Sequence, residues 1–168
     1  MSKNLVLVGF MGVGKSAVGR VLAARLKKDF VDLDVVIEER EKRPIDRIFQ
    51  DSGEAYFRQV EKTVVKEFSQ KESQVIACGG GAVLDKGNIG NLKQGGIIFY
   101  LKADPEAILQ RTKGHQHRPL LNVADPKKKV EELLMARRPF YEQADFIVDT
   151  SKQSVDQVVE EILRAIQK

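Results

Sequence analysis

The 168-residue chain has no tryptophan and one cysteine, and aromatic residues make up only 7% of it. A single cysteine, Cys78, allows no disulfide within the chain, so the composition predicts a cytoplasmic protein and not a disulfide-stabilised secreted domain. Because aromatic side chains are few, aliphatic residues must fill most of the core. With 42% hydrophobic residues, the sequence predicts one domain that spans residues 1–168.

Long apolar runs and basic stripes are also missing. No run approaches the roughly 20 apolar residues that a membrane-spanning helix needs, and the first residues lack the pattern of a secretion signal. The net charge of +4 nevertheless favours anionic ligands. Since the lysines and arginines are dispersed and not interleaved with aromatics, we predict small anionic ligands, with no nucleic-acid or membrane partner.

Short apolar runs alternate with amphipathic stretches, a pattern typical of βαβ units. We predict a three-layer α/β/α domain around a five-stranded parallel sheet. The expected strands are Leu5–Val8, Phe30–Leu33, Gln74–Cys78, Ile97–Lys102 and Phe146–Val148. The expected helices are Lys15–Lys27, Val35–Lys42, Pro44–Ser69, Pro105–Arg111, Pro126–Arg138 and Ser154–Gln167. The segment Lys113–Asn122 is polar and contains both histidines, so we expect a mobile loop there.

The residues from Gly9 to Ser16 fit the phosphate-loop pattern G-x-x-x-x-G-K-S between a predicted strand and a predicted helix. Glycines let the backbone N–H groups converge on phosphate oxygens, and the following helix adds its positive N-terminus. A glycine-rich turn with a chance lysine is the alternative, but the position after a strand and before a helix favours nucleotide binding. The predicted nucleotide-binding residues here are Gly12, Val13, Gly14, Lys15, Ser16 and Ala17, with Lys15 on the β- and γ-phosphates and Ser16 on magnesium.

Acidic residues follow the second predicted strand, where the carboxyl ends of parallel strands gather ligands. Asp32 and Asp34 would point the same way if strand geometry continues that far. Two carboxylates at such a place can hold Mg2+ and accept a hydrogen bond from a substrate hydroxyl. The alternative is a pair of solvated acids or a helix N-cap, for which Asp is favoured.

Arginines and glycines provide the other candidates for ligand binding. Arg58 and Glu61 share one helical face, either as a surface ion pair or with Glu61 orienting Arg58 toward a carboxylate. The glycine turn Gly79–Gly81 follows a strand, either as a tight turn or as a place where a ligand approaches the backbone closely. Arg118 and Arg137 are either solvated or stabilise the charge of a transferring phosphoryl group.

Together with the phosphate loop, these segments resemble those of the shikimate kinase family, in the same order along the chain. They are Asp32-Leu33-Asp34, Gly53-Glu54 to Phe57-Arg58 and Glu61, Gly79-Gly80-Gly81, Arg118-Pro119-Leu120-Leu121, and Arg137-Arg138-Pro139-Phe140-Tyr141. The resemblance runs from Leu5 to about Asp149. It implies a phosphate-loop kinase fold and transfer of the γ-phosphoryl group of ATP to the 3-hydroxyl of shikimate, in the pathway to chorismate and the aromatic amino acids. ATP and shikimate are then the small-molecule partners, Mg2+ is the cofactor and the enzyme acts as a monomer.

The resemblance also implies roles for single residues. Asp34 is the candidate base and binds the acceptor hydroxyls, and Asp32 helps Ser16 to hold magnesium. Residues from about 34 to 61 form the shikimate-binding segment, which includes Arg58. The glycine turn and Arg137 bind shikimate from outside this segment. Residues 112–124 form the lid, whose Arg118 contacts the nucleotide phosphates and joins Lys15 and Asp34 as a catalytic residue. Gln153 is expected near the nucleotide, since residues around Ser151–Ser154 are expected to border the adenine.

Two other functions fit parts of the sequence. A kinase of the same fold for another small acceptor, such as gluconate or a nucleoside monophosphate, would share the phosphate loop. A nucleoside monophosphate acceptor would require more arginines for its phosphate, and the paired aspartates suit a hydroxylated carboxylate better. A nucleotide-dependent switch or nucleic-acid-binding protein would require switch segments or a basic stripe, and the sequence shows neither.

Overall fold

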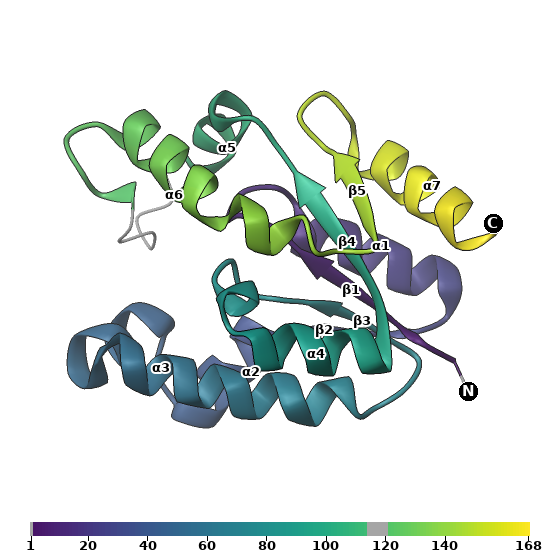
Figure 1. The fold of residues 1–168 in the computed structure, drawn as a ribbon, viewed down its shortest axis with the longest axis horizontal. Coiled ribbons are helices and arrows are strands. Elements are labelled where there is room, and N and C mark those ends of the chain that lie inside the picture. Colours follow the sequence, from purple (N-terminus) through teal and green to yellow (C-terminus); the bar gives the residue numbers. More distant parts are fainter. Residues whose placement is uncertain (1, 114–120) are drawn as a thin grey trace.

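A computed structural model describes residues 2–113 and 121–168, in which five strands form one parallel sheet with the order β2-β3-β1-β4-β5 (Figure 1). This confirms the predicted sheet. In chain order the strands are β1 (Asn4–Val8), β2 (Asp29–Asp32), β3 (Gln74–Ala77), β4 (Gly96–Lys102) and β5 (Phe146–Asp149). Since β1 pairs with both β3 and β4, the loop that follows β1 emerges at the centre of the sheet.

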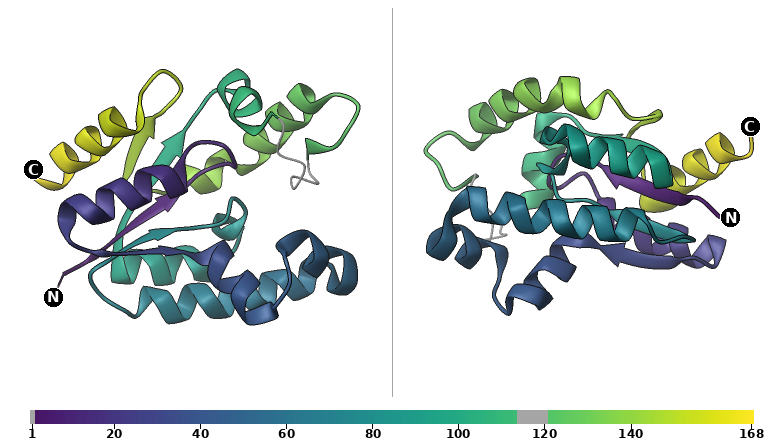
Figure 2. Two further views of the ribbon diagram at one scale, coloured as in Figure 1. Left: turned by 180° about the vertical axis from the view of Figure 1, so that it is seen from behind. Right: turned by 60° about the horizontal axis from the view of Figure 1, so that its bottom comes forward.

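Helices connect the strands and cover both faces of the sheet (Figure 2). Among residues 2–113 and 121–168, none of them has both the length and the apolar composition that crossing a membrane requires. They are α1 (Lys15–Leu26), α2 (Leu33–Glu41), α3 (Ile45–Ser69), α4 (Lys86–Gly95), α5 (Pro105–Thr112), α6 (Pro126–Tyr141) and α7 (Val155–Ile166), with a short 3-10 turn, η1 (Ala82–Leu84), before α4.

The alternation of side chains along the strands creates two cores. On β1, Leu5 and Leu7 pack on one face with buried residues of α1, α5 and α7. Val6 and Val8 point to the other face and pack with buried residues of α2, α3 and α4. The sheet is therefore buried on both faces, as expected for a three-layer α/β/α domain with parallel strands.

Side-chain caps fix several of the predicted helix starts. Asp104 accepts a hydrogen bond from Ala107 N at 2.8 Å, directly before Pro105 at the first position of α5. Ser154 and Gln157 form a reciprocal capping box at the start of α7. These contacts explain why α5 and α7 begin within a residue of where the sequence pattern predicts.

Three features of the helices differ from the sequence prediction. The helix α4 was not predicted, because three glycines lie in its sequence KGNIGNLKQG; its buried Ile89 and Leu92 and the Asp85 N-cap stabilise it instead. The long helix α3 is interrupted at Gly53, whose φ of 85° few other residues adopt. The helix α6 continues through Pro139 to Tyr141, beyond the expected end at Arg138.

Candidate active site

The phosphate loop joins the central strand β1 to α1. Gly12 and Gly14 have φ values of 79° and 98°, which require glycine, and the side chains of Phe10 and Val13 anchor the loop in the core. Lys15 Nζ donates hydrogen bonds to the carbonyl oxygens of Gly9 at 2.5 Å and Phe10 at 3.0 Å. The lysine therefore lies folded over the loop in which phosphates are expected to bind.

The first turn of α1 faces the end of β2. Ser16 Oγ donates a hydrogen bond to Asp32 Oδ2 at 2.7 Å. The other oxygen of Asp32 accepts from Asp34 N at 3.0 Å and Val35 N at 3.4 Å, which caps α2. Asp32 thus caps α2 and also contacts Ser16. The two alternatives for this residue, a helix N-cap and a carboxylate placed to bind magnesium, are therefore compatible.

Asp34 does not continue the strand. Because β2 ends at Asp32, Asp34 lies in the first turn of α2, so the strand geometry that would align the two carboxylates does not continue as far as Asp34. Its Oδ1 atom is buried, and no residue within 2–113 or 121–168 donates a hydrogen bond to it. Burial, and then the negative charges of Asp32 and Glu61, raise the pKa of Asp34 to about 6. A buried carboxylate with an open acceptor position suits a base that awaits a substrate hydroxyl.

The glycine turn lies where four charged side chains converge. A Cβ atom added at Gly79 would lie 2.7 Å from Asp34 Oδ1 and 3.2 Å from Glu61 Oε2. At Gly81 it would lie 2.5 Å from Arg58 Nη2, and at Gly80 it would lie 3.3 Å from Arg137 Nη1. A side chain at any of these positions would therefore push the charged groups away from where they converge, which is a reason for glycine beyond a tight turn.

Arg58 and Glu61 form more than a surface ion pair. Their Nη1 and Oε1 atoms are 2.8 Å apart, and the Glu61 side chain is only 3% exposed while that of Arg58 is 28% exposed. Burial raises the pKa of Glu61, and the Arg58 guanidinium opposes this rise. A buried acid thus fixes a partly exposed guanidinium, whose remaining donors can bind a carboxylate.

Arg137, on α6, completes this group of charged side chains. It is 7% exposed, and its guanidinium lies over the ring of Phe10 in the phosphate loop, 5.5 Å from the centroid. The structure therefore brings together Lys15, Asp32, Asp34, Arg58 and Arg137, which come from separate segments of the sequence.

The structure does not test two of the predicted residues. Arg118 and most of the predicted lid lie outside the described residues. Gln153 follows β5, where its Nε2 atom donates to Asp149 O at 2.6 Å and to Glu161 Oε2 at 2.8 Å. Its role at the nucleotide stays a prediction.

Sequence reasoning missed one residue that supports the phosphate loop. Arg111, at the end of α5, donates to the carbonyl oxygens of Gly12 and Val13, each at 3.4 Å. It also donates to Thr150 O at 2.6 Å and thereby joins the phosphate loop to the segment after β5. The only sequence signal was its place between a predicted helix and the polar loop, which does not separate it from a solvated arginine.

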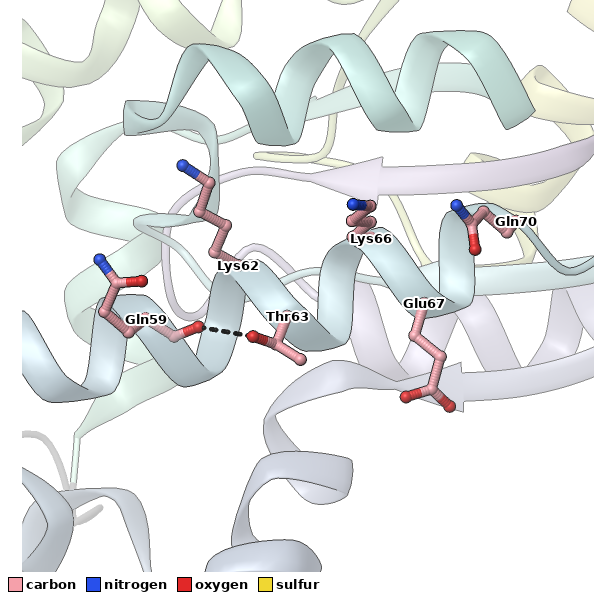
Figure 3. Close-up of a pocket in the computed structure, with 6 residues that line it drawn as sticks. All are labelled: Gln59, Lys62, Thr63, Lys66, Glu67 and Gln70. Atoms are coloured by element: carbon pink, nitrogen blue, oxygen red, sulfur yellow. Dashed lines mark hydrogen bonds between the residues drawn. The ribbon is translucent and has the colours of Figure 1, made fainter.

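A surface groove of about 470 Å³ lies along α3 (Figure 3). Its lining residues are polar in type and largely exposed, and none of them is a predicted site residue. The lining residues are Gln59, Lys62, Thr63, Lys66, Glu67 and Gln70. The convergence around the glycine turn, and not this groove, is therefore the candidate active site.

Comparison with known proteins agrees with this geometry. The family model described as shikimate kinase matches residues 11–167. The chain belongs to the shikimate kinase family. A shikimate kinase of Caldanaerobacter subterraneus is 45% identical over 163 residues, which are 97% of this chain and 95% of the relative. One of Thermodesulfovibrio yellowstonii is 44% identical over 166 residues, covering 99% of this chain and 96% of the relative. The chain is accordingly an ATP-dependent phosphotransferase with an alcohol group as acceptor.

The chain was also compared with solved structures of shikimate kinases and of a gluconokinase. A shikimate kinase of Acinetobacter baumannii in complex with shikimate superposes with a TM-score of 0.96 and 39% identity, covering 99% of this chain and 94% of the other. A gluconokinase of Sinorhizobium meliloti reaches a TM-score of 0.63 at 18% identity over 98% of this chain and 91% of the other, which shows a shared fold alone. Membership of the shikimate kinase family thus confirms the predicted resemblance over that alternative.

Proposed function

We propose that this chain transfers the γ-phosphoryl group of ATP to the 3-hydroxyl of shikimate, as a monomer in the cytoplasm. The observation that carries the proposal is the contact between the glycine turn and the phosphate loop. A Cβ atom at Gly80 would lie 3.7 Å from both Gly9 O and Met11 N. A ligand held by the charged groups around the glycine turn would therefore lie next to phosphates held by the loop, as in-line transfer requires.

The donor side is the phosphate loop and α1. Backbone N–H groups from Gly12 to Ala17 would bind the phosphates, and Lys15 would exchange its loop carbonyls for β- and γ-phosphate oxygens. Ser16 and Asp32 place two hard oxygen ligands 2.7 Å apart, a set that fits Mg2+, which binds few protein oxygens and keeps water and phosphate ligands. When bound, Mg2+ would neutralise charge on the phosphates.

The acceptor side is formed by Asp34, Arg58, Arg137 and the glycine turn. The two arginines would bind the single carboxylate of shikimate, and Asp34 would accept the proton of the attacking hydroxyl. The N–H groups of Gly79, Gly80 and Gly81 would donate to the ligand. Arg118 and the lid over residues 112–124 stay predictions from the family resemblance, in which closure brings that arginine onto the phosphates.

The first prediction concerns the carboxylate. We expect Arg58→Ala to weaken shikimate binding by about 2–5 kcal/mol, because Glu61 would stay buried without its partner and the ligand would lose its charged donor. ATP binding should change little. Calorimetric titration of both substrates would measure this, with Arg47→Ala as the control, since Arg47 lies on the same helix α3 and its side chain is 61% exposed. Equal losses for ATP and shikimate would contradict the assignment of Arg58 to the carboxylate.

The second prediction concerns pH. Since the pKa of Asp34 is raised to about 6, its base form is lost as the pH falls through that value. We therefore expect kcat/KM for shikimate to fall about tenfold for each pH unit below about 6, and to level off above it. A rate profile between pH 4.5 and pH 9 at constant ionic strength would measure the apparent pKa. A profile that is flat down to pH 4.5 would remove Asp34 as the base.

The identity of the product tests the proposed position of transfer. Two-dimensional 31P–1H correlation spectra of the reaction mixture would show which ring proton couples to the new phosphorus nucleus. We expect coupling to the proton on carbon 3 of the product. Coupling to the proton on carbon 4 or carbon 5 would show that another hydroxyl reacts.

A further inference from the structure

The carbonyl oxygens of the glycine turn have defined hydrogen-bond partners. Gly79 O accepts from Ala82 N at 3.1 Å, and Gly81 O accepts from Leu84 N at 3.2 Å, both within the local backbone. Gly80 O differs because its donor comes from a distant helix. Tyr141 Oη, 61 residues along the chain, donates to it at 2.5 Å.

Tyr141 is rigidly placed for this contact. Its side chain is fully buried, and its ring stacks on that of Tyr100 with the centroids 4.9 Å apart and the planes at 16°. It lies one helical turn after Arg137 on α6, so both side chains lie on the same face of the helix. The Arg137 guanidinium acts on the same phenol, where it opposes the rise in pKa that burial causes.

We propose that Tyr141 is a positioning residue for the acceptor, which fixes both the Gly80–Gly81 peptide and the Arg137 guanidinium. A trans peptide is planar, so its C=O and N–H groups point in opposite directions. By holding Gly80 O, the phenol fixes the direction of Gly81 N–H, one of the donors assigned to shikimate above. This inference rests on the proposed function of that site.

The chemistry of the phenol suits this role at all working pH values. Burial raises the pKa of Tyr141 to about 12, so the hydroxyl keeps the proton that it donates to Gly80 O. The phosphate loop is held by other contacts, such as those of Arg111. Loss of the Tyr141 hydroxyl should therefore affect the acceptor and leave the nucleotide site intact.

The test is Tyr141→Phe, with Tyr100→Phe as the matched control. Both variants lose one hydroxyl from the same stacked pair, but only Tyr141 reaches the glycine turn. We expect Tyr141→Phe to raise KM for shikimate about fivefold to tenfold, the effect of one lost hydrogen bond. KM for ATP should stay within about twofold of wild type in both variants, and Tyr100→Phe should leave both constants unchanged.

A second variant, destabilised at a site that does not contact the glycine turn, distinguishes a positioning role of Tyr141 from a general loss of stability. Ile162→Val removes one buried methyl group on α7, in the core on the opposite face of the sheet, and is expected to lower the free energy of unfolding modestly. If this variant raised KM for shikimate as much as Tyr141→Phe does, the effect would be one of stability and the inference would be wrong. An unchanged KM for shikimate in Tyr141→Phe, or an equal rise for ATP, would also overturn it. A wild-type protein that does not phosphorylate shikimate would instead refute the proposed function itself.

Discussion

Lys15→Ala is expected to lower kcat by about a thousandfold or more at saturating ATP and shikimate, while the protein stays folded. A preorganised cation that meets charge developing on the transferring phosphoryl group is worth at least as much as one oxyanion-hole donor, about a hundredfold to a thousandfold. In the free protein, Lys15 donates hydrogen bonds to the carbonyl oxygens of Gly9 and Phe10.

The control for this variant is Lys66→Ala, which removes an exposed lysine on α3 beside the surface groove. Its kcat should equal that of wild type, and thermal unfolding should show that both variants are folded. A folded Lys15→Ala variant with a rate close to that of wild type would refute the assignment of the phosphate loop.

Asp34→Asn is expected to lower kcat by about a hundredfold to ten thousandfold, the usual contribution of a general base. The amide has the shape of the carboxylate but cannot take a proton from the attacking hydroxyl. A steady-state assay with both substrates saturating would measure the loss. If Asp34→Asn kept more than about half of the wild-type kcat, another group would have to act as the base.

The same substitution should stabilise the fold. The pKa of Asp34 is about 6 in the folded protein, above its ordinary value of 3.8, so the folded state binds a proton that the unfolded state releases between these values. The free energy of unfolding therefore falls as the pH rises through this window. Above about pH 6, the buried carboxylate is ionised and destabilises the folded state to the full extent. We expect Asp34→Asn to raise the free energy of unfolding at pH 8 by on the order of 1–3 kcal/mol, and to remove this part of the pH dependence. Urea unfolding at pH 4 and pH 8 would measure both; a variant less stable than wild type at pH 8 would contradict the burial argument.

The parts of the structure that could be predicted from sequence are those with a local signal. The phosphate loop is a continuous motif in which glycine is needed where the backbone takes a positive φ value, as it does at Gly12 and Gly14. The strands follow from short apolar runs, and the caps at Asp104 and Ser154 fix two helix starts. The i, i+3 spacing of Arg58 and Glu61 likewise predicts their contact.

The parts that could not be predicted depend on tertiary packing. Asp32 and Asp34 would have pointed the same way only if strand geometry continued, but the N-cap at Asp32 starts α2 at Leu33, two residues before the expected start at Val35. The expected helix ended at Arg138, so the sequence did not predict that Tyr141 lies on α6 one turn after Arg137. The crowding around the glycine turn arises from side chains of α2, α3 and α6, so no local pattern in Gly79-Gly80-Gly81 contains it.

The most direct test of the central claim, that this site phosphorylates shikimate, is a coupled ADP-release assay with matched acceptors. ATP would be held saturating, and shikimate, gluconate and the nucleoside monophosphates would each be titrated at pH 8, where Asp34 is ionised. We predict rapid ADP release with shikimate, and release no faster than the acceptor-free background with the others. A rate with gluconate or a nucleoside monophosphate equal to or above that with shikimate would contradict the account.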